Sequence, residues 1–164
     1  YDMVWDAGYH FDSIFWWDDM GFKLKQFFSR RTYQRLLKPV HARAAAWAHS
    51  KGAKVHLHSC GDINPLIPDL IEIGVDMLNP LEVKAGMDPV AIKRQYGERI
   101  ALHGGINALL YNDVEALEAE VRRLVPVMKE GGGYMFSSDH TVPSSIGLKE
   151  FARIMNLAKE LGKY

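Results

Sequence analysis

Residues 53–62 read Ala-Lys-Val-His-Leu-His-Ser-Cys-Gly-Asp, a short apolar run that ends abruptly in chemically capable polar side chains. Such a run is typical of a buried strand, and a helix signal follows it. The same unit recurs along the chain, with polar clusters at residues 17–19, 58–62, 79–82, 103–107 and 137–140. Parallel strands bring such clusters to one edge of a sheet, where α/β proteins place ligands and catalysis. The recurrence therefore predicts an enzyme.

The apolar runs predict five buried parallel strands, at residues 11–17, 53–58, 75–79, 99–103 and 133–137. Right-handed crossovers turn successive strand–helix units the same way. A complete (β/α)₈ TIM-type barrel takes about 250 residues. Five units in 164 residues therefore predict an α/β fold that covers about the last five units of such a barrel. The alternative is an open, doubly wound five-stranded sheet, but residues 18–22 carry one glycine where a dinucleotide-binding fold uses three.

Helix signals fill the segments between the strands. The first predicted helix runs from a cap at Ser29 to Ser50, with a kink or break at Pro39. The next three helices are predicted to begin after caps at Asn64, Asp88 and Asp113, and the last to span residues 148–161.

Composition restricts the classes of function. The 20 basic and 20 acidic residues balance, so there is no electrostatic footprint for nucleic acid or an anionic membrane, and we expect a small-molecule substrate. A single cysteine and the lack of a signal peptide or bilayer-spanning run favour the cytoplasm. We expect residues 1–164 to form one domain, an N-terminally truncated fragment. Because five units leave the sheet edges open, we expect self-association or a missing N-terminal half.

His58 and Cys60 lie two residues apart at a strand end, so both side chains leave the same face. An imidazole and a thiolate suit zinc, which keeps an open position when the protein supplies three ligands. His140 is the preferred third ligand and Glu82 the next. The alternative is that Cys60 is a small buried apolar residue and His58 a hydrogen-bonded strand histidine.

Several other residues are candidates for the same mouth. Asp18 and Asp19 follow the first strand. We expect one of them to hydrogen-bond the substrate or to act as a general acid or base. The alternative is that one caps the following turn and the other is solvated. After His103, the pair Gly104-Gly105 either admits a ligand close to the backbone or simply makes a turn. The candidate catalytic residues are Asp18, Asp19, Glu82, His103 and His140, and the candidate substrate-binding residues are Trp17, Gly104, Gly105 and Asp139.

The remaining histidines and aromatic residues are predicted to be structural. We expect His56 to pack in the interior, and His10, His41 and His49 to be solvated without partners. Residues 15–17 (Phe-Trp-Trp) are expected to be mostly core, unless one ring lines the pocket.

Taken in order, residues 58–62, 79–82 with 86–89, 103–106, 132–134 and 138–140 with 142–143 resemble the C-terminal part of the uroporphyrinogen decarboxylase superfamily. This resemblance implies a (β/α)₈ barrel with its active site at the C-terminal mouth. It also implies one of two chemistries. One branch removes carboxyl groups from a tetrapyrrole in haem synthesis without a metal, and an aspartate binds the pyrrole NH groups. The other branch comprises cobalamin-dependent methyltransferases, in which zinc held by a His-x-Cys pair and a later cysteine activates a thiol or the methyl donor.

His58 and Cys60 match the first two zinc positions of the methyltransferase branch, but the later cysteine is absent. His140 stands in that region as a nitrogen ligand, with Glu82 and Asp62 expected to orient the ligands. We therefore predict zinc-dependent methyl transfer with a corrinoid as co-substrate. The residues leave open whether a separate corrinoid protein delivers the corrinoid. The first alternative is metal-free decarboxylation, in which Asp18 or Asp19 grips pyrrole NH groups and His140 or His103 meets a carboxylate. The second is a non-catalytic barrel remnant.

Overall fold

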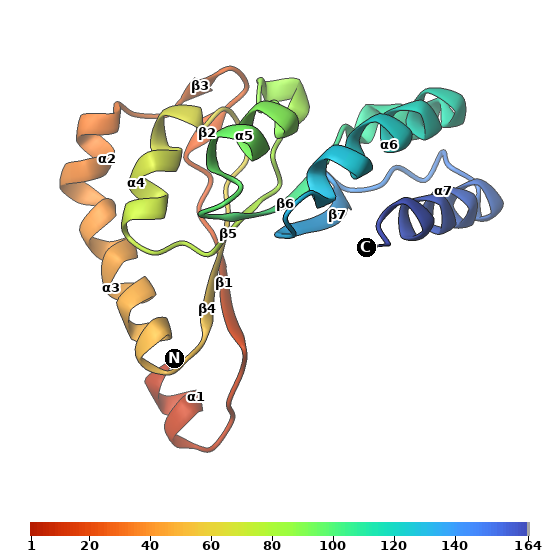
Figure 1. Cartoon of the computed structure of the whole chain (residues 1–164). Helices are drawn as coiled ribbons and strands as arrows, with labels where there is room; N and C mark the ends of the chain where they lie inside the picture. The colour runs from red at the N-terminus through yellow and green to blue at the C-terminus, as the bar shows by residue number, and fades with distance from the viewer. Residues whose placement is uncertain (164) are drawn as a thin grey trace.

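The computed structural model describes residues 1–163. Figure 1 shows the elements of this part of the chain, in which helices follow each strand of the main sheet. The strands are β1 (Ser13–Trp17), β2 (Gly21–Phe22), β3 (Lys25–Gln26), β4 (Lys54–His58), β5 (Met77–Asn79), β6 (Ala101–Ile106) and β7 (Tyr134–Ser138). The α-helices are α1 (Asp2–Asp6), α2 (Arg30–Leu36), α3 (Lys38–Ser50), α4 (Ile67–Glu72), α5 (Pro89–Tyr96), α6 (Val114–Lys129) and α7 (Leu148–Leu161).

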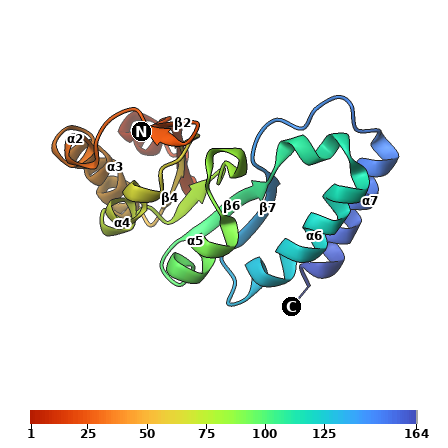
Figure 2. The same cartoon turned by 90° about the horizontal axis from the view of Figure 1, so that it is seen from above.

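Five strands form one parallel sheet whose spatial order, β1-β4-β5-β6-β7, is also their order along the chain. Because all crossovers run in one direction and have the same hand, the helices cover a single side of the sheet. Seen from above, α4 to α7 follow the outer side of the arc made by the strands (Figure 2). A doubly wound sheet needs a reversal of strand order, so that alternative is wrong. The open arc is consistent with part of a TIM-type barrel, and the described strands do not close it.

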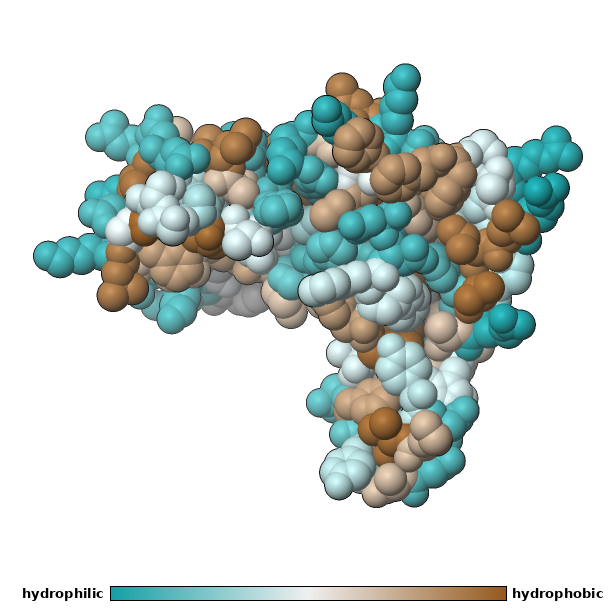
Figure 3. Space-filling view, turned by 180° about the vertical axis from the view of Figure 1, so that it is seen from behind, coloured by the Kyte–Doolittle hydropathy of each residue, from teal (hydrophilic) through white to brown (hydrophobic). Residues whose placement is uncertain are grey.

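The two sides of the sheet differ in burial. Toward the helices, Ile14, Val55 and Leu102 are at most 2% exposed and belong to the hydrophobic core. On the other side, Phe15 is 43% and Trp17 75% exposed. The prediction that residues 15–17 are mostly core is therefore wrong, because only Trp16 packs against the core. The view from behind looks onto this uncovered side, where hydrophilic and hydrophobic residues are interleaved (Figure 3). This side of the sheet is therefore open.

Most predicted helix starts are confirmed by capping hydrogen bonds. The side chains of Ser29, Asp88 and Asp113 accept bonds from backbone N–H groups in the first turns of α2, α5 and α6. The first helical segment divides into α2 and α3 just before Pro39. Asn64 makes no capping bond and instead starts a 3₁₀ turn that leads into α4. No helix in the described part of the chain is long and apolar enough to span a bilayer.

The antiparallel hairpin of β2 and β3 was not predicted. It lies against the loop that follows β4, where a Cβ added to Gly61 would come within 2.2 Å of the Gly21 carbonyl carbon. Gly61 also has φ +77°, a conformation that favours glycine. The hairpin is therefore seated on the backbone of the loop that carries Cys60, and this loop bounds the candidate site.

Candidate functional site

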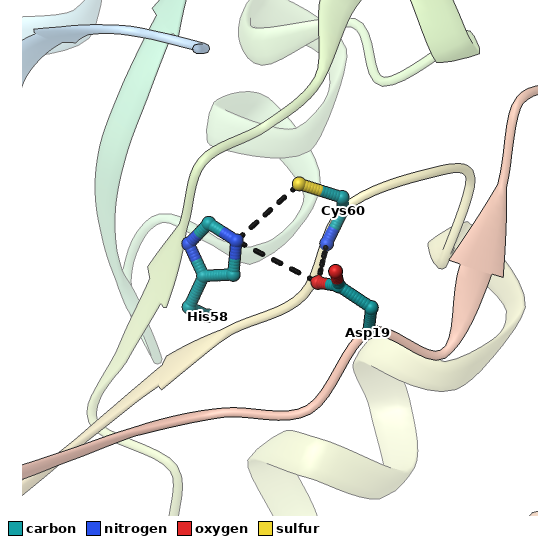
Figure 4. A group of neighbouring side chains, drawn as sticks. All are labelled: Asp19, His58 and Cys60. Atoms are coloured by element: carbon teal, nitrogen blue, oxygen red, sulfur yellow. Dashed lines mark hydrogen bonds and ion pairs between the residues drawn. The ribbon is translucent and has the colours of Figure 1, made fainter. Parts of the chain in front are cut away.

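Three side chains from neighbouring strand ends converge at the carboxyl edge of the sheet (Figure 4). Asp19 follows β1, and His58 and Cys60 lie at and just after the end of β4. The Nε2 atom of His58 lies 3.3 Å from Cys60 Sγ and 3.6 Å from Asp19 Oδ1. One ligand atom of each residue lies within 4.8 Å of the other two. Nitrogen, sulfur and oxygen donors therefore face a common space.

The imidazole of His58 is oriented by Asn79 on the adjacent strand. Asn79 Nδ2 donates to the carbonyl oxygen of His103 at 3.3 Å, which turns Asn79 Oδ1 toward His58 Nδ1, 2.5 Å away. Because an amide oxygen only accepts, His58 Nδ1–H is the donor. The lone pair of His58 then lies on Nε2, the nitrogen that faces Asp19 and Cys60. This tautomer is the one that a metal-binding histidine needs.

Asp19 and Cys60 are joined by a further contact, because the Cys60 N–H donates to Asp19 Oδ1 at 2.9 Å. Burial, together with the nearby carboxylates of Asp19 and Glu82, raises the pKa of the Cys60 thiol to about 11. A cation in the common space would offset both effects and favour the thiolate. The electrostatics of the group thus suit a bound cation.

The group passes a simple test against zinc geometry. With Zn–N and Zn–O bonds near 2.0–2.1 Å and a Zn–S bond near 2.3 Å, tetrahedral ligands put N and S about 3.6 Å apart and N and O about 3.3 Å apart. The observed distances are 3.3 Å from His58 Nε2 to Cys60 Sγ and 3.6 Å from His58 Nε2 to Asp19 Oδ1, each within about 0.3 Å of these values. The ligand atoms of Asp19 and Cys60 lie within 4.8 Å of each other. Three protein donors would leave the fourth position for a substrate. The residues present therefore fit zinc.

The structure does not bring the expected third ligand into this group. His140 is exposed on the loop after β7 and, within residues 1–163, does not join the donors around His58. Glu82, the second candidate, accepts from the Gly61 N–H at 2.7 Å and so supports the loop that carries Cys60. Asp19 takes the third place because β1 pairs with β4 in a register that sets Trp17 beside His58.

Asp18 and Asp19 point in different directions. The Asp18 carboxylate accepts from His41 Nε2 at 2.8 Å, on the helix-covered side of the sheet, while Asp19 reaches the candidate site. The prediction that His41 is solvated and without a partner is wrong, because this residue is 5% exposed and also contacts Tyr33. His49 is exposed as predicted but does have a partner, because its Nε2 contacts Asp76 at 2.8 Å.

His103 lies in β6 as predicted, but β6 continues to Ile106, so Gly104 and Gly105 lie within the strand rather than after it. His103 Nδ1 lies 3.3 Å from Nε2 of the half-buried His56, and burial is the main cause that lowers the pKa of both imidazoles. The glycines admit protein rather than ligand: a Cβ on Gly104 would come within 2.0 Å of the Pro80 carbonyl oxygen. Their small size is therefore explained by packing.

Two other predicted carboxylates hold backbone. Asp139 is fully buried, and its two oxygens accept from the N–H groups of Val83 and Ala108 at 2.9 and 2.8 Å. The prediction that Asp139 binds the substrate is therefore wrong. Asp62 accepts from the Asn64 N–H at 3.0 Å and so shapes its own turn. Trp17, by contrast, remains at the mouth, with its ring centroid 5.6 Å from that of His58.

The comparison with protein families matches residues 10–161 to the family described as uroporphyrinogen decarboxylase (URO-D). This match covers nearly the whole chain. The chain belongs to the uroporphyrinogen decarboxylase family. A search of curated proteins gave no match.

Among solved structures, the chain is similar to a methyltransferase from Methanosarcina mazei, with a TM-score of 0.70 and 22% sequence identity. The match covers 96% of this chain and 44% of that one, so the chain spans less than half the length of the neighbour. At this identity the likeness shows a shared fold.

Proposed function

We propose that this chain is part of a zinc-dependent methyltransferase of the URO-D family that exchanges a methyl group between a corrinoid and a thiol or a methylated small molecule. The observation that carries the proposal is the convergence of Asp19, His58 and Cys60 with nitrogen, sulfur and oxygen donors at zinc-like spacing. A methyltransferase with the same fold supports the reaction class. When bound, zinc would lower the pKa of a coordinated thiol or polarise an ether oxygen.

The chain's own residues would bind the metal and orient the substrate. His58 presents Nε2 because Asn79 holds its Nδ1–H, and Asp19 supplies an oxygen donor while gripping the Cys60 N–H. Glu82 fixes the loop through Gly61. We place the substrate next to Asp19, His58 and Cys60, beside the exposed ring of Trp17, on which a planar or aliphatic group could pack.

The first test is the metal content of the purified chain by plasma mass spectrometry after growth with added zinc. About one zinc per chain is expected, with its loss in Cys60→Ala and a marked reduction in Asp19→Asn. His140→Ala is the matched control, and we expect it to keep its zinc. If Cys60→Ala retains the metal and full methyl transfer from methylcobalamin to a thiol, the proposal is wrong.

Metal-free decarboxylation of a tetrapyrrole is the alternative within the family. Its carboxylate for pyrrole NH groups would have to be Asp19, since Asp18 contacts His41 and Asp139 is fully buried. Steady uroporphyrinogen turnover in the presence of a strong chelator would favour this alternative. The absence of zinc and of both activities, measured on a longer chain that closes the barrel, would favour a non-catalytic remnant.

A further inference from the structure

A chain of three hydrogen-bonded side chains, two buried and one partly exposed, lies behind the candidate metal site. His41 on α3 contacts Asp18 Oδ2 through Nε2 at 2.8 Å and the Tyr33 hydroxyl through Nδ1 at 3.2 Å. Tyr33 is fully buried and His41 is 5% exposed, so both depend on protein partners for their hydrogen bonds. These contacts connect α2, α3 and the end of β1, which are separate elements of the sequence.

The directions of these hydrogen bonds follow from the chemistry of the groups. A carboxylate only accepts, so His41 Nε2–H donates to Asp18. In the neutral imidazole, Nδ1 then accepts from the Tyr33 hydroxyl. The chain therefore fixes the His41 ring at both nitrogens and directs one N–H at Asp18.

The residue after Asp18 is the metal-ligand candidate Asp19, and the backbone on its other side is also held. The Met20 N–H donates to Ser59 Oγ at 3.0 Å within the core, and the Asp18 N–H donates to the His58 carbonyl oxygen at 2.9 Å. Asp19 itself is 55% exposed. An exposed ligand thus stands between two anchored neighbours.

We propose that His41 is a positioning residue for metal binding, because its Nε2–H holds Asp18 and thereby presents Asp19 to His58 and Cys60. This inference rests on the proposed function, since it takes these three residues as the metal site. Without the His41 contact, ordering the segment would oppose metal binding, and Asp19 would sample other directions. Hydrogen-bond partners behind metal ligands typically change metal affinity by about 10–100-fold.

Two substitutions of His41 distinguish the loss of its contact with Asp18 from the loss of the imidazole ring. In His41→Gln, the side-chain amide nitrogen reaches roughly the place of Nε2 and keeps a donor for Asp18. In His41→Asn, the shorter amide lies near Nδ1, keeps a partner for Tyr33 and loses Asp18. Tyr33→Phe removes the far end of the chain and leaves the contact between His41 and Asp18 in place.

The test is a titration of the metal-free chain with Co²⁺, followed by thiolate-to-cobalt absorption, with zinc affinities from competition against a chromophoric chelator. We expect His41→Asn to bind about 10-fold or more weakly, and His41→Gln and Tyr33→Phe to stay near the unsubstituted chain. His49→Asn is the matched control, because His49 holds Asp76 from the same helix at the same 2.8 Å, away from the site. Urea unfolding of each metal-free variant reports stability separately.

Each outcome decides the inference. Equal Co²⁺ affinity in His41→Asn and the unsubstituted chain overturns it, and so does a loss in His41→Gln as large as that in His41→Asn. Affinities that follow the unfolding free energies, with Tyr33→Phe and His49→Asn weakened alike, also overturn it, because His41 is then structural. If the unsubstituted chain takes up neither Co²⁺ nor zinc, the metal site of the proposed function fails, and the inference fails with it.

Discussion

Asp69 in the first turn of α4 is the most heavily bonded buried charge of the helical layer, and its removal is the sharpest test of how the layer is held. The residue is 1% exposed and accepts from Lys38 at 2.7 Å, from Gln34 at 3.0 Å and from Arg30 at 2.5 Å. These donors come from α2 and from the start of α3, the helices that carry Tyr33 and His41. We predict that Asp69→Asn destabilises the whole chain.

The magnitude follows from the pKa of Asp69. Burial raises this pKa, but the hydrogen bonds from Arg30, Lys38 and Gln34 outweigh burial and lower it from 3.8 to about 2. A difference of one pKa unit corresponds to about 1.4 kcal/mol. The ionised carboxylate therefore contributes about 2 kcal/mol to the free energy of unfolding at neutral pH. Asn has a similar shape but no charge, so Asp69→Asn should lose about that amount.

The pH dependence has a definite sign. Because the folded-state pKa lies below the unfolded-state value, the contribution is fully present above about pH 4 and is lost as the pH falls toward about 2. Urea unfolding followed by circular dichroism at several pH values measures this. The gap between the unsubstituted chain and Asp69→Asn should be about 2 kcal/mol at pH 7 and should close in acid.

Glu72→Gln is the matched control. Glu72 contacts the same Lys38 at 2.8 Å, but its side chain is 70% exposed, so the change should cost less than about 1 kcal/mol. A gap for Asp69→Asn that is absent at neutral pH, or that persists unchanged near pH 2, would refute the reasoning, because the loss would then not come from the charge.

Three further outcomes are expected. Asn79→Leu leaves His58 Nδ1–H without its acceptor, so zinc affinity by chelator competition should fall about 10–100-fold with little loss of fold by circular dichroism. Gly61→Ala, whose Cβ would meet Gly21 at 2.2 Å in a positive-φ conformation, should lower the free energy of unfolding by about 1–3 kcal/mol. The uncovered sheet face should make the chain alone self-associate in light scattering, and a monodisperse monomer that binds no hydrophobic dye would contradict this.

The repeating pattern of strand, polar cluster and helix predicted the sheet because each signal is local. The hairpin of β2 and β3 escaped because its strands have two residues each, too short for a period to show. His41 was misread because its partners, Asp18 and Tyr33, come from other elements and leave no mark in the residues around it. Contacts that depend on tertiary packing are invisible to a reading of local pattern.

Asp19, the third donor, could have been predicted from the pairing of strands. His140 was the predicted third ligand because it follows the last strand, and the region of the later cysteine in the resembling family is the same. Yet β1 pairs directly with β4, and with Trp17 opposite His58 the next residues of each strand bring Asp19 level with Cys60. The order of strands in a singly wound arc implies this pairing, so strand neighbours were a better guide than the ends of the chain.

The position of the three donors also separates metal binding from turnover. Asp19, His58 and Cys60 lie at or just after the ends of the first two strands of the sheet. Asn79, which holds His58, lies on the adjacent strand, and His41, which holds Asp18, lies on α3. None of these contacts needs the barrel to close. Enclosing a substrate beside Trp17 does need cover for the open sheet face, because exclusion of water depends on it. We therefore expect the chain on its own to bind zinc with an affinity set by these local contacts, even where methyl transfer by the same preparation is slow.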